Sequence, residues 1–151
     1  MVTALENFGT LSGWGKEHHN DGFQNFKEIP TWDLHHATYT SPYVQFSDKE
    51  VQNHDFQPLD KFEGDEQTII DTYNPQAKWP WLYINGQYAQ AGAGYSPGLL
   101  QGQAFDDLYQ QLTSGTRNEA TQAVKDEARL ITSYICHSTG GPSLRSRSEP
   151  G

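Results

Sequence analysis

The clearest pattern of apolar positions lies near the end of the chain, between Asn118 and His137. Apolar residues recur there at the spacing of one face of an α-helix. They are Ala120, Val124, Ala128, Ile131 and Ile135. The charged residues between them fall largely on the opposite face, and the sequence TGGP at 139–142 is typical of a helix end. The pattern therefore predicts an amphipathic helix over 118–137.

A shorter helical pattern opens the chain. Val2, Leu5 and Phe8 have helical spacing and are followed by Gly9, a residue favoured just past a helix end. Two interpretations stay open: the last turns of a helix whose beginning is absent, or a short helix with a frayed start.

Two more helices are expected in the middle of the chain. The sequence DEQTIIDTYN predicts a short helix over 65–74, and Pro75 stops it. Ser96 followed by Pro97 is typical of an N-cap and a first helical position, which predicts a helix over 97–113.

Alternation of apolar and polar residues predicts the strands. We expect strands over 14–18, 31–38 and 42–47, the last two joined or bent at Ser41–Pro42. The sequence WLYI, then Asn-Gly, then QYAQAG predicts a hairpin within 81–92, because Asn-Gly readily adopts the positive φ angles of a type I′ turn.

The length, the net charge and the apolar content of the chain disfavour several classes of protein. The chain has 151 residues, enough for one domain with a core, and we expect that domain over 1–142 with a disordered tail over 143–151. The net charge of −9 disfavours nucleic acid and anionic membranes as partners. No stretch has the length of apolar sequence that a membrane span needs, and the first ten residues lack the basic and apolar segments of a signal peptide.

The proline between two tryptophans, at Trp79–Pro80–Trp81, precedes the first strand of the predicted hairpin. A proline is tolerated there wherever the missing amide would face solvent. The order of elements supports a second interpretation, because a short helix, a proline loop, a hairpin and a C-terminal helix form the second half of the thioredoxin fold. In that fold a cis proline leaves the backbone edge before it free to pair with an extended peptide. A cis bond between Trp79 and Pro80 is therefore expected, since X-Pro bonds favour trans by only about 0.5–1 kcal/mol.

Four segments together resemble an uncharacterised thioredoxin-like family, the domain of unknown function nine-two-nine. They are FGTLSG (8–13), YTSPYVQF (39–46), WPWLYINGQYAQAGAGYSPGLL (79–100) and ITSYICHSTGGP (131–142). They occur in the family's order at similar spacings. The resemblance implies a thioredoxin-like α/β fold, a mixed sheet with flanking helices, that is incomplete at its N-terminal side.

The same resemblance implies which groups this chain lacks. Family members commonly carry a strand and a Cys-X-X-Cys-type segment in a region that would lie before Met1. They also tend to have a second cysteine, able to pair with the one that matches Cys136, a few residues after TGGP. This chain has one cysteine, which lies near a helix C-terminus, where the helix dipole opposes a thiolate. We therefore expect no catalytic residues and no thiol–disulfide exchange, with Cys136 a disulfide candidate whose partner is absent.

The resemblance also implies a binding surface. Trp79 and Pro80 are the candidate substrate-binding residues, for an extended peptide or protein, and the alternative is that both tryptophans beside Pro80 pack in the core or a loop. Without the central strand, backbone edges would be left unpaired, so we expect a fragment that is marginally stable or prone to associate with itself. The compartment of this chain is unknown, and full-length relatives are expected outside the cytoplasm or anchored to a membrane.

Three other functions have weaker support in the sequence. Neighbouring strand residues point to opposite faces, so His18–His19 and His35–His36 each supply one ligand at most to a given metal, and no metal site or cofactor is expected. The four tryptophans and eight tyrosines are compatible with a noncatalytic carbohydrate-binding module. The sequence GYSPG at 94–98 resembles a hydrolase nucleophile elbow, but Ser96 is displaced by one position and fits better as a helix cap.

Overall fold

The computed structural model describes residues 1–21, 26–53 and 55–140, which form a mixed α/β structure. Its helices are α1 (Val2–Leu5), α2 (Asp65–Tyr73), α3 (Phe105–Ser114) and α4 (Glu119–Ser138), with a 3₁₀ helix, η1, at Pro97–Leu100. Its strands are β1 (Thr10–Ser12), β2 (Gly15–Asp21), β3 (Phe26–Asp33), β4 (Thr38–Thr40), β5 (Trp81–Ile84) and β6 (Tyr88–Ala91). The predicted tail over 143–151 lies outside the described residues.

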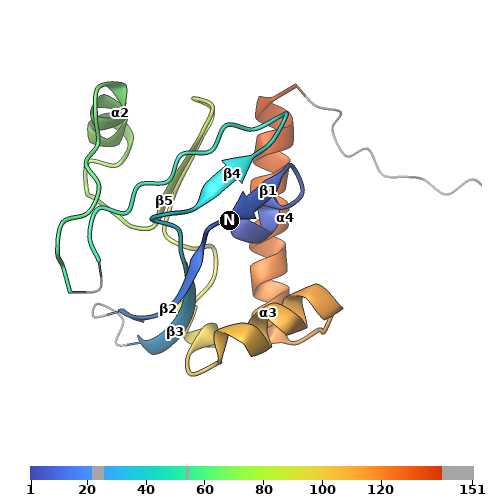
Figure 1. Cartoon of the computed structure of the whole chain (residues 1–151). Helices are drawn as coiled ribbons and strands as arrows, with labels where there is room; N and C mark the ends of the chain where they lie inside the picture. Colours follow the sequence, from blue (N-terminus) through green and yellow to red (C-terminus); the bar gives the residue numbers. More distant parts are fainter. Residues whose placement is uncertain (22–25, 54, 141–151) are drawn as a thin grey trace, which may run out of the picture.

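Within the described residues the strands form three antiparallel pairs, β1–β4, β2–β3 and β5–β6 (Figure 1). The single mixed sheet expected from the sequence is not formed by these residues. The predicted strand at 42–47 is also absent from the three pairs, although its side chains alternate between half-buried and exposed from 44 onward. The physical reason is the lack of a neighbour: no described strand lies beside it to supply hydrogen bonds.

The predicted strand over 31–38 is displaced. β3 ends at Asp33, a turn closed by the Ala37 N–H donating to the Leu34 carbonyl follows, and β4 begins at Thr38. The predicted hairpin is confirmed, because β5 pairs with β6 and both Asn85 and Gly86 have positive φ, 48° and 70°.

The long helix α4 organises the core through its apolar stripe. Its N-terminal half contributes Ala120 and Val124 to a cluster with Ile29, Leu100 and Leu108. Its C-terminal half contributes Ala128, Ile131 and Ile135 to a second cluster. Residues from α1 and β5 pack on that second cluster: Ala4, Leu5, Leu82 and Ile84. The predicted stripe is therefore confirmed, and it supports both halves of the molecule.

The start of α4 is fixed by a capping box. The Asn118 side chain accepts a hydrogen bond from the Thr121 N–H at 2.8 Å, and the Asn118 N–H donates to the Thr121 hydroxyl at 3.0 Å. These two bonds satisfy backbone and side-chain groups at the helix end, and Thr121 is fully buried.

The helix predicted over 97–113 is divided into η1 and α3. Between them Gly102 adopts a positive φ of 72° and donates its N–H to the Glu28 carbonyl on β3. This bond ties the break to the β2–β3 pair, which explains why the helix is not continuous. Pro97 opens η1 as expected, but Ser96 makes no side-chain capping bond.

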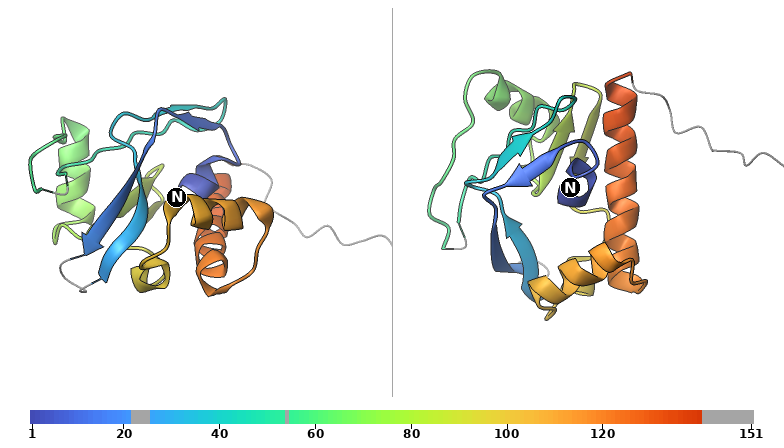
Figure 2. Two further views of the ribbon diagram at one scale, coloured as in Figure 1. Left: turned by 60° about the horizontal axis from the view of Figure 1, so that its bottom comes forward. Right: turned by 45° about the vertical axis from the view of Figure 1, so that its right-hand side comes forward.

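The layers place β5 and β6 between two helices (Figure 2). α4 covers the face of the pair that carries Leu82 and Ile84, and α2 lies on the other side, where Tyr73 stacks on Tyr83. α3 crosses one end of α4 and supports an aromatic cluster on the β2–β3 pair. This arrangement leaves β5 accessible along one edge, where the candidate site lies.

Candidate functional site

Trp79 and Pro80 lie on the loop that enters β5, and the peptide bond between them is cis, as expected. Both residues are exposed, and Trp79 keeps 45% of its surface open to solvent. The Trp79 ring stacks on Phe62, with ring centroids 5.9 Å apart and an interplanar angle of 12°. One face of the indole is thus supported by Phe62, while much of the residue remains free for contact.

The loop is held by Asn74, which is buried to 5% exposure. Its side chain donates to the Lys78 carbonyl at 3.0 Å and accepts from the Lys78 N–H at 3.0 Å. These two bonds close the turn between α2 and Trp79. Asn74 was not predicted from the sequence. Its signal is an asparagine directly before Pro75, since asparagine side chains commonly bond to turn backbones.

β5 presents an unpaired backbone edge directly after this loop. The Gly92 N–H donates to the Pro80 carbonyl at 2.7 Å, so Pro80 and Gly92 form a hydrogen-bonded pair of the ladder. Two residues further along each strand, Leu82 and Gln90 are the next hydrogen-bonded pair. Bonded and non-bonded pairs alternate in an antiparallel ladder, so the N–H and C=O groups of Trp81 and Tyr83 point away from β6. Within the described residues β5 pairs with β6 alone, and no turn or loop backbone group bonds to Trp81 or Tyr83.

A groove of about 340 Å³ lies beside this edge. Leu82, Tyr83 and Ile84 line it on the β5 side, and residues 43–46 line it on the other. Its remaining lining includes the core side chains Leu5, Ile131 and Ile135 from α1 and α4. The groove therefore has an apolar floor between two stretches of backbone.

A row of stacked aromatic rings covers the outer face of β5. Trp81 and Tyr83 lie 5.5 Å apart with an interplanar angle of 20°, and Tyr73 from α2 stacks on Tyr83 at 5.5 Å. Tyr73 is 57% exposed, so the row reaches the surface. The two faces of β5 thus differ: aliphatic toward α4 and aromatic toward α2.

A cluster of carboxylates lies next to the groove and begins at Asp48, two residues after the wall residue Phe46. Burial, with the nearby charges of Glu50 and Asp60, raises the pKa of Asp48 to about 6. The Asp48 Oδ2 atom is buried and has no hydrogen-bond partner among the described residues. Asp60 behaves in the opposite way, since the Glu50 N–H donates to its carboxylate at 2.9 Å and lowers its pKa, assisted by His35. This acidic cluster favours a cationic group beside it.

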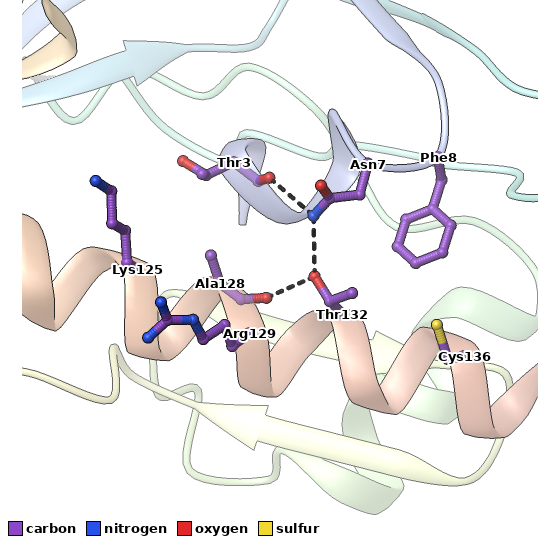
Figure 3. A pocket seen from close by; sticks show the side chains of 8 residues that line it. All are labelled: Thr3, Asn7, Phe8, Lys125, Ala128, Arg129, Thr132 and Cys136. Atoms are coloured by element: carbon purple, nitrogen blue, oxygen red, sulfur yellow. Dashed lines mark hydrogen bonds between the residues drawn. The ribbon is translucent and has the colours of Figure 1, made fainter. Parts of the chain in front are cut away.

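Cys136 lies apart from this groove. It is half-buried in the last turn of α4 and lines a hollow of about 510 Å³ between α1 and α4 (Figure 3). Asn7 bridges the two helices there, donating to the Thr132 hydroxyl at 3.2 Å and to the Thr3 carbonyl at 3.4 Å. Because Cys136 is the chain's single cysteine, no second thiol can resolve a mixed disulfide on it.

The histidines do not converge on a metal-like arrangement. His35 contacts Asp60 through its Nδ1 atom at 3.3 Å and lies against the His36 ring. His18 lies on β2, opposite Pro30, and the side chain of His19 lies outside the described part of the chain. Among the described residues no group of three or more His, Cys, Asp or Glu side chains is placed to hold a metal ion.

Comparison of the chain with protein-family models, curated proteins and solved structures finds no match. Among the described residues, no helix combines the length and the apolar character needed to cross a membrane.

Proposed function

We propose that this chain is a thioredoxin-like domain that binds an extended peptide along β5 and performs no thiol–disulfide exchange. The observation that carries the proposal is the unpaired edge of β5, which begins directly after the exposed Trp79–Pro80 loop. Main-chain hydrogen bonds to such an edge supply affinity for an extended peptide, and neighbouring side chains supply selectivity.

Trp79 has the features of a peptide anchor. It is partly exposed, supported on one face by Phe62, and held in place by the Asn74 turn. An aromatic residue presented in this way contributes a large contact area at small cost in conformational entropy. Peptides that run along β5 would pass it as they leave the strand.

Two assays test the proposal with matched variants. A random library of acetylated nine-residue peptides is selected on the immobilised chain, and the best binders are measured by calorimetry. Trp79→Ala should weaken their binding by tenfold or more, whereas Leu130→Ala, at a similarly exposed apolar residue on α4, should leave it unchanged. Failure to select any binder refutes peptide binding. Insulin turnover with dithiothreitol above the uncatalysed rate refutes the noncatalytic part.

A carbohydrate-binding function is the second candidate, favoured by the stacked row Tyr73–Tyr83–Trp81. Sugar rings stack on such aromatic platforms. A glycan array separates the two functions: specific glycan signals that Tyr73→Ala abolishes would support the carbohydrate function, and a blank array alongside selected peptides would reject it.

A further inference from the structure

Two backbone stretches without hydrogen-bond partners face the same groove. On β5 they are the main-chain groups of Tyr83, which lines the groove, and of Trp81, two residues earlier on the same strand edge; on the opposite wall they are those of Gln45 and Phe46. The wall residues 43–46 alternate in burial as a strand does, with Val44 and Phe46 packed on the core cluster. The two walls therefore resemble the neighbours of a strand that is not among the described residues.

The composition of β5 is that of an inner strand rather than an edge strand. Its sequence, WLYI, contains no charge and no proline, and both its faces carry large apolar or aromatic side chains. Natural edge strands are usually protected by charged residues, prolines or bulges, whereas strands with two covered faces are usually paired on both edges. β5 thus lacks the protection that a permanently free edge requires.

The groove also has room for an occupant. Its volume of about 340 Å³ corresponds to roughly ten waters at about 30 Å³ each. Protein interiors are close-packed, so an apolar hollow of this size above Leu5, Ile131 and Ile135 is a place where more side chains can be buried. Residues 43–46 line one side of the groove and residues 82–85 the other, which suits a bound segment of about four or five residues.

We propose that an extended segment of another polypeptide inserts into the groove as a strand, hydrogen-bonded on one side to β5 and on the other to residues 43–46. The proposal rests on the function proposed above and specifies how the peptide is held. Apolar side chains at alternate positions of the segment lie on the floor, and those between them lie beside Trp81 and Tyr83.

Charge selects a cationic partner rather than a second copy. The chain carries a net charge of −9, so two copies repel each other. Beyond the wall, Asp48, Glu50 and Asp60 form the acidic cluster described above. A segment that bears lysine or arginine at the end nearest Asp48 gains favourable charge contacts that a copy of this acidic chain lacks.

Designed peptide libraries test the sequence pattern. One library of acetylated nine-residue peptides places Val or Ile at every second position, with Lys, Thr or Tyr between them. The control library has the same composition with the apolar residues at helical spacing. The alternating library should be enriched at least tenfold on the chain. Equal enrichment of the two libraries overturns the proposed pattern.

Backbone methylation tests insertion between two walls. Successive amides of a strand point to opposite edges, so an inserted strand uses consecutive N–H groups, while a strand added only to β5 uses every second one. N-methylation at each position of the best binder should therefore weaken binding tenfold or more at consecutive central positions. N-methylation of the first residue, beyond the groove, is the control and should have little effect.

The outcomes separate this inference from the function on which it rests. Weakening at alternate positions only leaves peptide binding intact and overturns insertion. No binder from the random or designed libraries overturns both. A chain that sediments as a dimer at low salt, with the amides of Trp81, Tyr83 and Gln45 protected from hydrogen exchange before peptide is added, overturns the inference because a second copy fills the groove.

Discussion

Asp48→Asn should stabilise the chain at neutral pH and leave its stability almost unchanged in acid. The substitution keeps the shape of the side chain and removes its charge. It acts on a carboxyl whose Oδ2 atom is buried without a partner among the described residues, next to the carboxylates of Glu50 and Asp60. An ionised group there is costly, and the asparagine removes that cost.

The magnitude follows from the pKa. Burial, followed by the charges of Glu50 and Asp60, raises the pKa of Asp48 from 3.8 to about 6. A raised pKa means that the folded state holds the proton more tightly than the unfolded state, so stability falls as the pH rises from about 4 to about 6 and stays low above that. Two pKa units correspond to about 3 kcal/mol. Because Asp48 is only half-buried, solvent screening reduces the expected gain for the asparagine variant to about 1–2 kcal/mol at pH 7.

The measurements are urea unfolding and thermal unfolding, both followed by circular dichroism, at pH 4, 5, 6 and 7 for the wild type and the variant. A gain of about 1–2 kcal/mol at pH 7 should appear as a higher melting temperature by about 2–8 °C for a chain of this size. His35 also lies near Asp48 and lowers its pKa, so the series includes His35→Gln to remove that contribution. Asp71→Asn, at an exposed carboxylate on α2, is the matched control and should change stability by less than about 0.5 kcal/mol.

The pH dependence of the stability gain distinguishes removal of a buried charge from new hydrogen bonds of the amide. A gain that is equal at pH 4 and pH 7 would come from new hydrogen bonds of the amide and would refute the electrostatic reasoning. A loss of stability at pH 7 would show that the ionised carboxylate is paired in solution.

Four other outcomes are expected. Cys136→Ser should leave peptide binding unchanged, and neither form should turn over insulin above the background rate. Asn118→Ala should cost about 1 kcal/mol in urea unfolding because it removes the α4 capping box, whereas Asn118→Asp should retain most of the stability. Gly9→Ala should cost more than about 2 kcal/mol, since an added Cβ would lie 2.3 Å from the Thr40 carbonyl oxygen, while the exposed neighbour change Thr10→Ala should be nearly neutral. Raising the salt concentration from about 0.1 M to about 1 M shortens the screening length from about 10 Å to about 3 Å, so self-association measured by sedimentation should increase; a chain that stays monomeric at 1 M salt would contradict the role given to charge.

The sequence predicts best the elements whose signals are local. Asn-Gly readily adopts the positive φ angles of a tight turn, so the β5–β6 hairpin follows from a few neighbouring residues. The α4 stripe repeats over five turns, and it correctly indicates which residues enter the two core clusters. The cis bond before Pro80 also agrees with expectation.

The incorrect predictions concern segments whose structure depends on contacts between residues that are distant in the sequence. Residues 42–47 have the alternation of a strand, but strand formation needs a partner, and none of the described strands lies beside them. The helix predicted over 97–113 is divided because Gly102 bonds to Glu28 on β3, a contact that no local pattern indicates. The Asp48 cluster was missed for the same reason, since Asp48 and Asp60 are brought together only by the fold.

The proposed peptide recognition is separable from thiol–disulfide chemistry in this chain. Disulfide exchange depends on two thiols, and the single cysteine lies in the hollow between α1 and α4, away from the groove residues of β5. The proposed recognition along β5 would use main-chain groups, which every residue carries, and an apolar floor that belongs to the core. Neither of these features requires a thiol. Backbone methylation of the peptide tests recognition, and Cys136→Ser tests chemistry, so the two properties can be measured independently on the same chain.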